Sequence, residues 1–208
     1  MHSKFTVIIP TLWRSAHIHT MLDAYEQCEL VGEIILIDND NAASNKLNKQ
    51  YTKLRVLPQQ ENIYVNPAWN LGVSFANYSK IAIANDDILF STDIFEWVKD
   101  HMNTGVIGMC CSNYDPIDRD LPYELEKVDR RPPGWGCLMF IEKHNYTPIP
   151  LWLKIACGDD YLMDNVKGGA YILKNLRVGG RMSATSLLGD YVRVADEDIE
   201  TYKQMKND

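Results

Sequence analysis

Short apolar runs recur along the first half of the chain, and stretches with helical spacing of apolar residues separate them. The first run, residues 5–9, is β-branched, apolar on both faces and followed by Pro10. A run of this kind is typical of a strand that is buried on both faces of a parallel sheet. Similar runs predict further strands at residues 33–37, 54–57, 80–84 and 106–111.

The stretches between these runs predict helices. Apolar side chains recur at helical spacing in residues 15–30, in the segment that begins at Asn66, and from Ser91 or Thr92 to His101. Asn66 followed by proline is a typical N-cap and first helical residue. The strand and helix repeat about four times, and this alternation indicates an α/β fold with a mostly parallel central sheet flanked by helices.

The pattern changes in the second half of the chain. Residues 112–133 are rich in Asp, Arg and Pro and predict a long loop, which inside a compact domain usually serves a function. Beyond it we expect strands at residues 136–141 and 170–173, a short helix at 159–166, and a polar helix or tail from about residue 195. We therefore expect one domain over residues 1–208, with halves of about 1–111 and 112–208.

Composition and charge narrow the class of protein. The 208 residues are 46% hydrophobic and 24% charged, which is ordinary for a globular domain and excludes a disordered or fibrous chain. With 21 Lys and Arg against 28 Asp and Glu, the net charge is −7. An acidic chain is a poor non-specific binder of nucleic acid, so we expect no nucleic-acid partner. The same charge would repel a phosphorylated ligand.

The cysteines and the lengths of the apolar runs indicate the cellular compartment. The five cysteines include no CxxC pair, so we expect small buried thiols in a reducing environment. The first apolar run is too short for a signal peptide, and no run of 18 apolar residues could span a membrane. We expect a soluble cytoplasmic protein, which is either a minimal protein or one domain of a longer chain.

Polar clusters follow three of the predicted strands. They are Pro10-Thr11, Asp38-Asn39-Asp40 and Asn85-Asp86-Asp87. Ligands of open parallel sheets bind beyond the carboxyl ends of the strands. Adjacent carboxylates at such an end can coordinate a hard divalent cation, which would bridge the acidic protein to an anionic ligand. The alternative is a turn-forming or helix-capping pair of acids before residue 88.

The order of these motifs resembles that of glycosyltransferases with the GT-A fold, and most of all the large family 2 of these enzymes. The resemblance extends over about residues 4–166. It rests on a strand followed by Pro10-Thr11, a second strand ending in Asp38-Asn39, the helix motif Asn70-Leu71-Gly72, the acidic motif Asn85-Asp86-Asp87, the small-residue segment 134–139, and the pair Asp159-Asp160.

The resemblance implies roles for individual residues. Pro10, Thr11 and Arg14 would line the uracil and ribose pocket, Asp38 or Asn39 would bind the base, and Asn70 would belong to the nucleotide-sugar site. Asp87 would ligate Mn²⁺ or Mg²⁺, while Asp86 and Asn85 would contact the ribose or the metal and its water shell. Asp160, or its neighbour Asp159, would be the general base.

The resemblance also implies an activity. It is the metal-dependent transfer of a hexose or deoxyhexose from a UDP-sugar donor to a carbohydrate or other hydroxyl acceptor, with inversion at the anomeric carbon. Residues 112–208 would then form the acceptor side. A sugar nucleotidyltransferase is a second hypothesis, although the turn at residues 10–14 lacks the glycine that close approach to phosphates needs. A non-catalytic nucleotide-sugar-binding module is a third.

Several candidate residues have two interpretations. Trp135 could stack on a sugar or pack in the core. Arg181 could clamp a diphosphate or lie in a solvated loop. The acidic pair at residues 159–160 could be the base or could favour the positive end of a helix dipole. Arginines of the long loop could meet the acceptor or keep the loop soluble; they are Arg119, Arg130 and Arg131.

Overall fold

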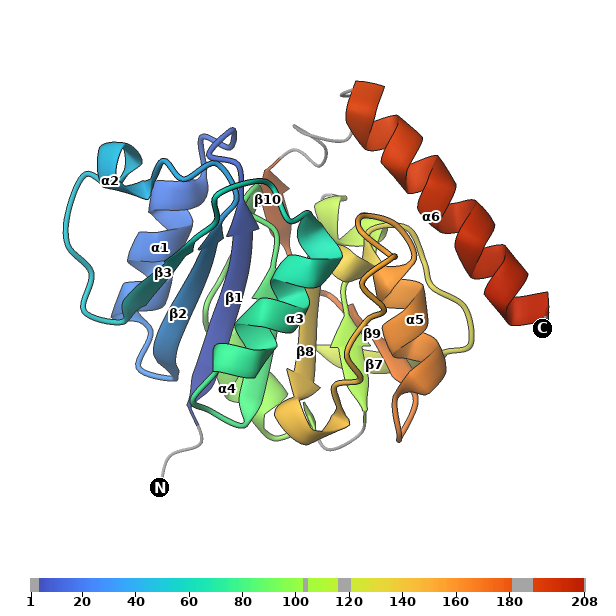
Figure 1. Ribbon diagram of the computed structural model, residues 1–208. Helices are drawn as coiled ribbons and strands as arrows, with labels where there is room; N and C mark the ends of the chain where they lie inside the picture. The colour runs from blue at the N-terminus through green and yellow to red at the C-terminus, as the bar shows by residue number, and fades with distance from the viewer. Residues whose placement is uncertain (1–3, 103–104, 116–120, 181–188, 208) are drawn as a thin grey trace.

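The structure is a computed structural model that describes residues 4–102, 105–115, 121–180 and 189–207. It is organised around one large β-sheet (Figure 1). The strands of this sheet are β1 (Phe5–Thr11), β2 (Val31–Asp38), β3 (Leu54–Pro58), β4 (Lys80–Ala84), β6 (Val106–Gly108), β7 (Glu124–Val128), β8 (Leu138–Glu142) and β9 (Ala170–Lys174). In the described residues the strand order is β3-β2-β1-β4-β8-β6-β9-β7. The two halves of the chain share this sheet, because β8 lies between β4 and β6.

The directions of the strands decide which ends meet at one edge. Strands β1, β2, β3 and β4 are parallel to one another, whereas β8 is antiparallel to both β4 and β6. The first strands and β8 therefore point in opposite directions in Figure 1. Ala84 at the end of β4 pairs with Leu138 at the start of β8. Hence the carboxyl ends of β1, β2 and β4 lie at the same edge as the amino end of β8.

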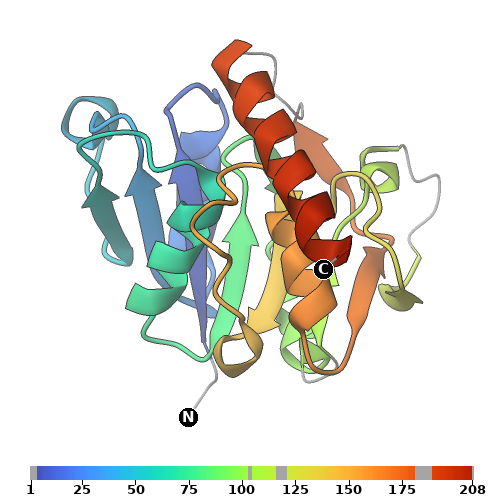
Figure 2. The same ribbon diagram turned by 45° about the vertical axis from the view of Figure 1, so that its right-hand side comes forward.

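Helices cover both faces of the sheet, as the sequence predicted. Helices α1 (Ile18–Gln27) and α4 (Ile94–Lys99) pack on one face, while α3 (Val65–Phe75) and α5 (Gly158–Asn165) pack on the other. Helix α6 (Gly189–Asn207) lies over α5 (Figure 2). Shorter elements are α2 (Ala43–Lys46), η2 (Cys111–Tyr114), η3 (Trp135–Cys137), η4 (Lys143–Asn145) and the two-stranded sheet of β5 (Ile88–Phe90) and β10 (Val178–Gly180). None of the helices in the described ranges combines the length and the apolar character that a bilayer crossing needs.

Burial on both faces explains the apolar first strand. Val7 and Ile9 face the core beneath α1 and α4, and Ile8 faces the core beneath α3. On the first of these faces the ring of Phe95 meets Phe5 edge-on, with 4.9 Å between ring centroids, and it meets Phe140 at 5.7 Å. The mixed α/β fold with a mostly parallel sheet is confirmed.

The structure corrects the expectation of an unbroken loop at residues 112–133. The segment contains the end of η2 and the strand β7, which pairs antiparallel with β9 at the edge of the sheet. Charged residues flank Leu125 on both sides in this strand. The strand tolerates them because it lies at the edge of the sheet and is partly exposed. The small sheet of β5 and β10 was likewise not predicted, because three-residue strands leave little periodicity.

Two predicted helix starts are also wrong. Helix α3 begins at Val65 with Tyr64 at the N-cap, and Asn66 is a fully buried residue of the first turn. Its side-chain amide donates to the carbonyl of Ala156, 3.1 Å away, so a tertiary contact replaces the expected cap. Helix α4 has Asp93 at its N-cap position, without a side-chain capping bond.

The contact between α3 and β1 depends on a residue without a side chain. An ideal Cβ on Gly72 would lie 2.3 Å from Cγ2 of Ile8. We expect Gly72→Ala to destabilise the fold, because overpacking costs about 1–3 kcal/mol and the better helix propensity of alanine offsets at most about 1 kcal/mol. Chemical denaturation measures the change. Ser74→Ala, at an exposed position of the same helix, is the matched control and should stay within about 0.5 kcal/mol of wild type. Equal stability of the two variants would contradict the packing argument.

Candidate functional site

A buried threonine links the ends of β1 and β4. The hydroxyl of Thr11 donates to Oδ2 of Asp86, 2.6 Å away, and accepts a hydrogen bond from the backbone N–H of Trp13 at 2.8 Å. Thr11 is only 3% exposed. One side chain therefore fixes both the turn after β1 and the first carboxylate after β4.

The carboxylate of Asp38, at the end of β2, holds the neighbouring loops. Its Oδ1 accepts from the indole N–H of Trp13 at 2.8 Å, and its Oδ2 accepts from the backbone N–H of Ala43 at 2.7 Å. Trp13 has a positive φ of 58°, a conformation that costs energy in a bulky residue and is held here by these bonds. Next to Asp38, the side-chain oxygen of Asn39 accepts a longer hydrogen bond of 3.4 Å from the backbone of Ile63.

Two adjacent carboxylates follow β4, and both are largely shielded from water. Burial raises the pKa of Asp86 to about 6; the hydrogen bond from Thr11 opposes this shift and the charge of Asp87 adds to it. Asp87 is 8% exposed. The backbone of β10 lies directly against it, since an ideal Cβ on Gly180 would be 2.1 Å from the carbonyl oxygen of Asp87.

A second pair of carboxylates begins α5. The chain enters this helix through Cys157, which has a positive φ of 58°. The side chain of Asp159 packs on Gly136, where an ideal Cβ would be 2.8 Å from Oδ2. Burial raises the pKa of Asp159 to about 6, with Arg131 lowering it and Asp160 raising it. A carboxyl group with such a pKa can exchange a proton near neutral pH.

An arginine from the long loop pairs with these acids. The Nε of Arg131 donates to Oδ2 of Asp160 at 2.8 Å and lies 3.5 Å from Oδ2 of Asp159. The sequence analysis offered only acceptor contact or solubility for this arginine, and the structure shows an ion pair instead. No sequence signal could have found it, because 29 residues separate Arg131 from Asp160.

Cys137 lies between the two carboxylate pairs. The backbone N–H of Asn85 donates to its carbonyl at 2.9 Å, which links the end of β4 to the start of β8. Burial raises the pKa of the Cys137 thiol to about 12, and the charges of Asp87 and Asp159 both contribute. Gly136, the residue before Cys137, packs against Asp159. The segment 136–137 therefore brings the two carboxylate pairs to the same part of the sheet edge.

The start of α6 carries a half-buried tyrosine, Tyr191. Burial raises the pKa of its hydroxyl, and the charges of Cys137, Asp159 and Asp87 contribute. Tyr191 was not among the predicted site residues, since the helix was expected only from about residue 195.

The model of glycosyl transferase family 2 matches residues 6–156, more than half of the chain. The chain belongs to this family. The predicted resemblance is thereby confirmed, and the order of weak motifs along the sequence was the correct signal.

Solved structures of a protein from S. aureus show the same fold. TarS residues 1–349 has a TM-score of 0.58 at 17% identity, covering 84% of this chain and 59% of that one. The complex of TarS 1–349 with UDP has a TM-score of 0.60 at 15% identity and covers 94% of this chain and 65% of that one. The complex with UDP-GlcNAc has a TM-score of 0.58 at 15% identity and covers 92% of this chain and 64% of that one. The present chain thus spans less than two thirds of these structures. A comparison with curated proteins gives no match.

Most of the predicted site residues of this member of glycosyl transferase family 2 lie at one edge of the sheet. Arg14 is an exposed residue just beyond the end of β1. The residues at or near the carboxyl ends of the first strands, together with the start of α5, are Pro10, Thr11, Asp38, Asn39, Asn85, Asp86, Asp87, Asp159 and Asp160.

Two other predicted residues lie elsewhere. Trp135 is wholly buried, with its indole N–H bonded to the carbonyl of Tyr171 at 3.0 Å, so it packs in the core and does not stack on a sugar. The amide of Asn70 exchanges hydrogen bonds with the backbone of Ile149, donating at 2.7 Å and accepting at 2.9 Å. It therefore fastens α3 to the segment before α5. Arg181 lies outside the described residues.

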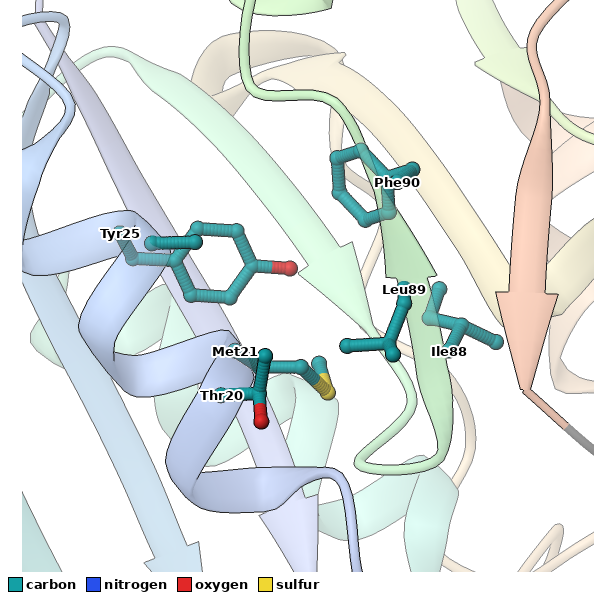
Figure 3. Close-up of a pocket in the computed structure, with 7 residues that line it drawn as sticks. Thr20, Met21, Tyr25, Ile88, Leu89 and Phe90 are labelled. Carbon is teal, nitrogen blue, oxygen red and sulfur yellow. The ribbon is translucent and has the colours of Figure 1, made fainter.

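An apolar pocket of about 290 Å³ lies away from these acids, between α1 and β5 (Figure 3). Its lining residues are Thr20, Met21, Ala24, Tyr25, Ile88, Leu89 and Phe90. None of the predicted site residues is among them. The pocket lies against β5, the strand that follows Asp87.

The raised pKa of Asp86 has a consequence for stability. Because this pKa is about 6 in the folded protein against 3.8 ordinarily, the folded state binds this proton more tightly than the unfolded chain does. The ionised carboxylate therefore costs stability increasingly as the pH rises from about 4 through about 6. We expect Asp86→Asn to stabilise the fold at pH 8 by roughly 1–2 kcal/mol, less than the full pKa shift implies because solvent screens a partly open group.

Thermal or chemical unfolding at pH 4 and pH 8 measures this effect. The stabilisation should disappear at pH 4, where Asp86 is protonated in the folded wild type. Asp40→Asn, at an exposed position of the same edge, is the control and should show little change at either pH. Stabilisation of the same size at both pH values would refute the electrostatic explanation.

Proposed function

We propose that this chain transfers a hexose or deoxyhexose from a UDP-sugar to a hydroxyl group of a glycan or other acceptor, with inversion and with the help of a divalent cation. The observation that carries the proposal is the position of two carboxylate pairs, 86–87 and 159–160, beside the segment 136–137. Gly136 packs against Asp159, and the carbonyl of Cys137 accepts from the backbone N–H of Asn85 at 2.9 Å. Membership of glycosyl transferase family 2 and the capture of UDP and UDP-GlcNAc by TarS support a UDP-linked donor.

The carboxylates after β4 fit a divalent cation. Burial and the charge of Asp87 make the ionised form of Asp86 costly, and a bound cation would relieve that cost. Over the described ranges, no group of three or more His, Cys, Asp or Glu side chains could enclose a metal. Mg²⁺, and Mn²⁺ with the same oxygen ligands, is often held by one or two carboxylates with substrate phosphates and water. When bound, the cation would neutralise charge on the departing diphosphate.

The turn after β1 and the end of β2 suit the nucleoside. In this proposal Pro10 and Thr11 form the floor of the pocket, and the exposed Arg14 closes its outer side. Asp38 already bonds Trp13 and Ala43 through its two oxygens, so it shapes the wall of the pocket. Asn39, with only a 3.4 Å bond to its side-chain oxygen, is the better contact for the base. Asn85 and Asp86 would meet the ribose, and Arg181 would meet the diphosphate.

Asp160 is the proposed general base. Its side chain is 28% exposed and that of Asp159 is 16% exposed, so an acceptor reaches Asp160 more easily. The acceptor hydroxyl gives its proton to the Asp160 carboxylate as its oxygen bonds to the anomeric carbon. The bond from that carbon to the diphosphate oxygen breaks on the opposite face, and UDP leaves. Arg131 holds Asp160 in place before the acceptor arrives.

The competing hypotheses fit less well. A nucleotidyltransferase would use backbone N–H groups of the turn after β1 to hold a triphosphate. Here the N–H of Trp13 is bonded to the hydroxyl of Thr11, and the indole fills the turn against Asp38. A non-catalytic binding module would have no use for a buried carboxyl such as Asp159, whose pKa of about 6 costs stability at neutral pH.

Cation-dependent binding of UDP is the first test. We expect UDP to raise the melting temperature when Mn²⁺ is present and to have little effect without it, because the cation would bridge Asp87 and the diphosphate. At about 100 times its Kd, UDP should stabilise the fold by roughly 2.7 kcal/mol. Asp87→Ala should abolish the joint effect, whereas Asp40→Asn should preserve it. A full shift by UDP alone would exclude the cation bridge.

Loss of the base is the second test. A screen of UDP-, GDP- and TDP-sugars that follows nucleotide release identifies the donor. With that donor, Asp160→Asn should lower kcat by about 10²–10⁴-fold while UDP still shifts the melting temperature. If Asp159→Asn abolishes transfer and Asp160→Asn does not, the base is Asp159. If both variants keep wild-type activity, neither carboxyl is the base.

A further inference from the structure

We propose that Asp198, on α6, is the positioning residue for the acidic pair at the start of α5; the catalytic part of this proposal rests on the proposed function above. One oxygen of its carboxylate, Oδ2, accepts hydrogen bonds from three successive backbone N–H groups. They belong to Lys154 at 2.9 Å, Ile155 at 2.6 Å and Ala156 at 2.9 Å. The side chain is almost fully buried, with 2% of Asp198 exposed.

Such an arrangement is a strong local constraint. Successive N–H groups that converge on one point form a concave anion site, and bonds to an ionised oxygen are stronger than bonds between neutral groups. The segment from Lys154 to Ala156 belongs to no helix or strand. Without Asp198 it would therefore have three backbone donors to satisfy in another way, and leaving a buried donor unpaired costs about 1–3 kcal/mol.

The constrained segment leads directly to the acids. Ala156 is followed by Cys157, with its φ of 58°, and by Gly158, where an ideal Cβ would lie 2.1 Å from Oδ1 of Asn66. Asn66 also donates to the carbonyl of Ala156 at 3.1 Å. The chain before Asp159 is thus held by α3 on one side and by α6 on the other. A displacement at residues 154–156 would be passed on to the carboxylates.

Helix α6 also contacts the far end of α5. The carboxylate of Asp164 accepts from the hydroxyl of Tyr202 and from the ammonium of Lys206, the latter at 2.6 Å. In Figure 2, α6 crosses over α5 and over the segment that leads into it. Asp198 and Tyr202, one turn apart, therefore face α5 and its entry. The polar C-terminal segment of the sequence acts as a brace for the acidic pair.

The experiment compares Asp198→Ala with Val194→Ala. Val194 is 3% exposed and lies one turn earlier on α6. Its truncation loosens the packing of the helix and leaves in place the three hydrogen bonds from residues 154–156 to Asp198. Transfer kinetics, UDP-induced thermal shift and hydrogen exchange of backbone amides are measured for both variants. We expect Asp198→Ala to lower kcat by about 30- to 100-fold, with the donor KM and the UDP shift nearly unchanged, because a misplaced base costs rate and not donor binding. Exchange at residues 154–160 should accelerate.

Val194→Ala should keep kcat within about threefold of wild type and leave exchange at residues 154–160 unchanged. This should hold even if its melting temperature falls as far as that of Asp198→Ala. Asp198→Asn keeps one acceptor oxygen without its charge and should recover most of the lost kcat. If the alanine chain does not fold, exchange at residues 154–160 is measured in the asparagine variant, where it should still be faster than in wild type because bonds to a neutral oxygen are weaker. The proposal is overturned if Asp198→Ala and Val194→Ala lose kcat equally, or if exchange at residues 154–160 does not respond to Asp198.

The outcome is separable from that of the proposed function. If the wild-type chain transfers no sugar from any donor, the proposed function fails, and the catalytic role of Asp198 fails with it. If Asp159→Asn and Asp160→Asn are both fully active, neither carboxyl is the base, and the catalytic role of Asp198 fails although transfer stands. If Asp160→Asn is inactive while Asp198→Ala behaves as Val194→Ala does, the proposed function stands and only the positioning role is lost.

Discussion

Negative charge crowded at one edge of an apolar sheet is the constraint on which the rest of this structure depends. Four carboxylates, Asp86, Asp87, Asp159 and Asp160, lie on the two sides of the segment 136–137, which packs against Asp159 and bonds the backbone of Asn85. Burial makes ionisation of Asp86 and Asp159 costly, and each adjacent acid adds repulsion. A fold that keeps these groups together must hold them firmly, because the unrestrained chain would separate them.

The neighbouring residues supply the opposing forces. The hydrogen bond from Thr11 lowers the free-energy cost of ionising Asp86. The guanidinium of Arg131 does the same for Asp159 and forms an ion pair with Asp160. Glycines at positions 136 and 180 allow the backbone to approach the acids closely. Helix α6 then holds the segment before α5 through Asp198. The residual electrostatic strain suits the proposed ligands, which are a cation and an anionic nucleotide.

The sequence was informative where local chemistry decides the structure. Residues 81–84 are apolar and are followed by three polar side chains, so both the buried strand and the polar cluster at its carboxyl end could be predicted. The place of β8 between β4 and β6 could not, because strand order depends on packing between distant segments. Trp135 appeared to be a candidate for sugar stacking since it lies between glycines. Its burial depends on Gly108, which leaves room for the ring. Asp198 and Arg131 act across more than 25 residues of sequence, and nothing in their surroundings marks them.

The antiparallel strand β8 has a consequence for the order in which the protein forms. Strands β1 to β4 can assemble from the first 84 residues, but β4 then ends the sheet with unpaired backbone groups, because its partner β8 begins only at Leu138. Open strand edges attract other chains, and pairing across such sequence distances is slow. A ribosome-bound chain would therefore carry Asp86 and Asp87 beside an incomplete sheet until the second half emerges. Completion of the sheet and completion of the acidic site are the same event.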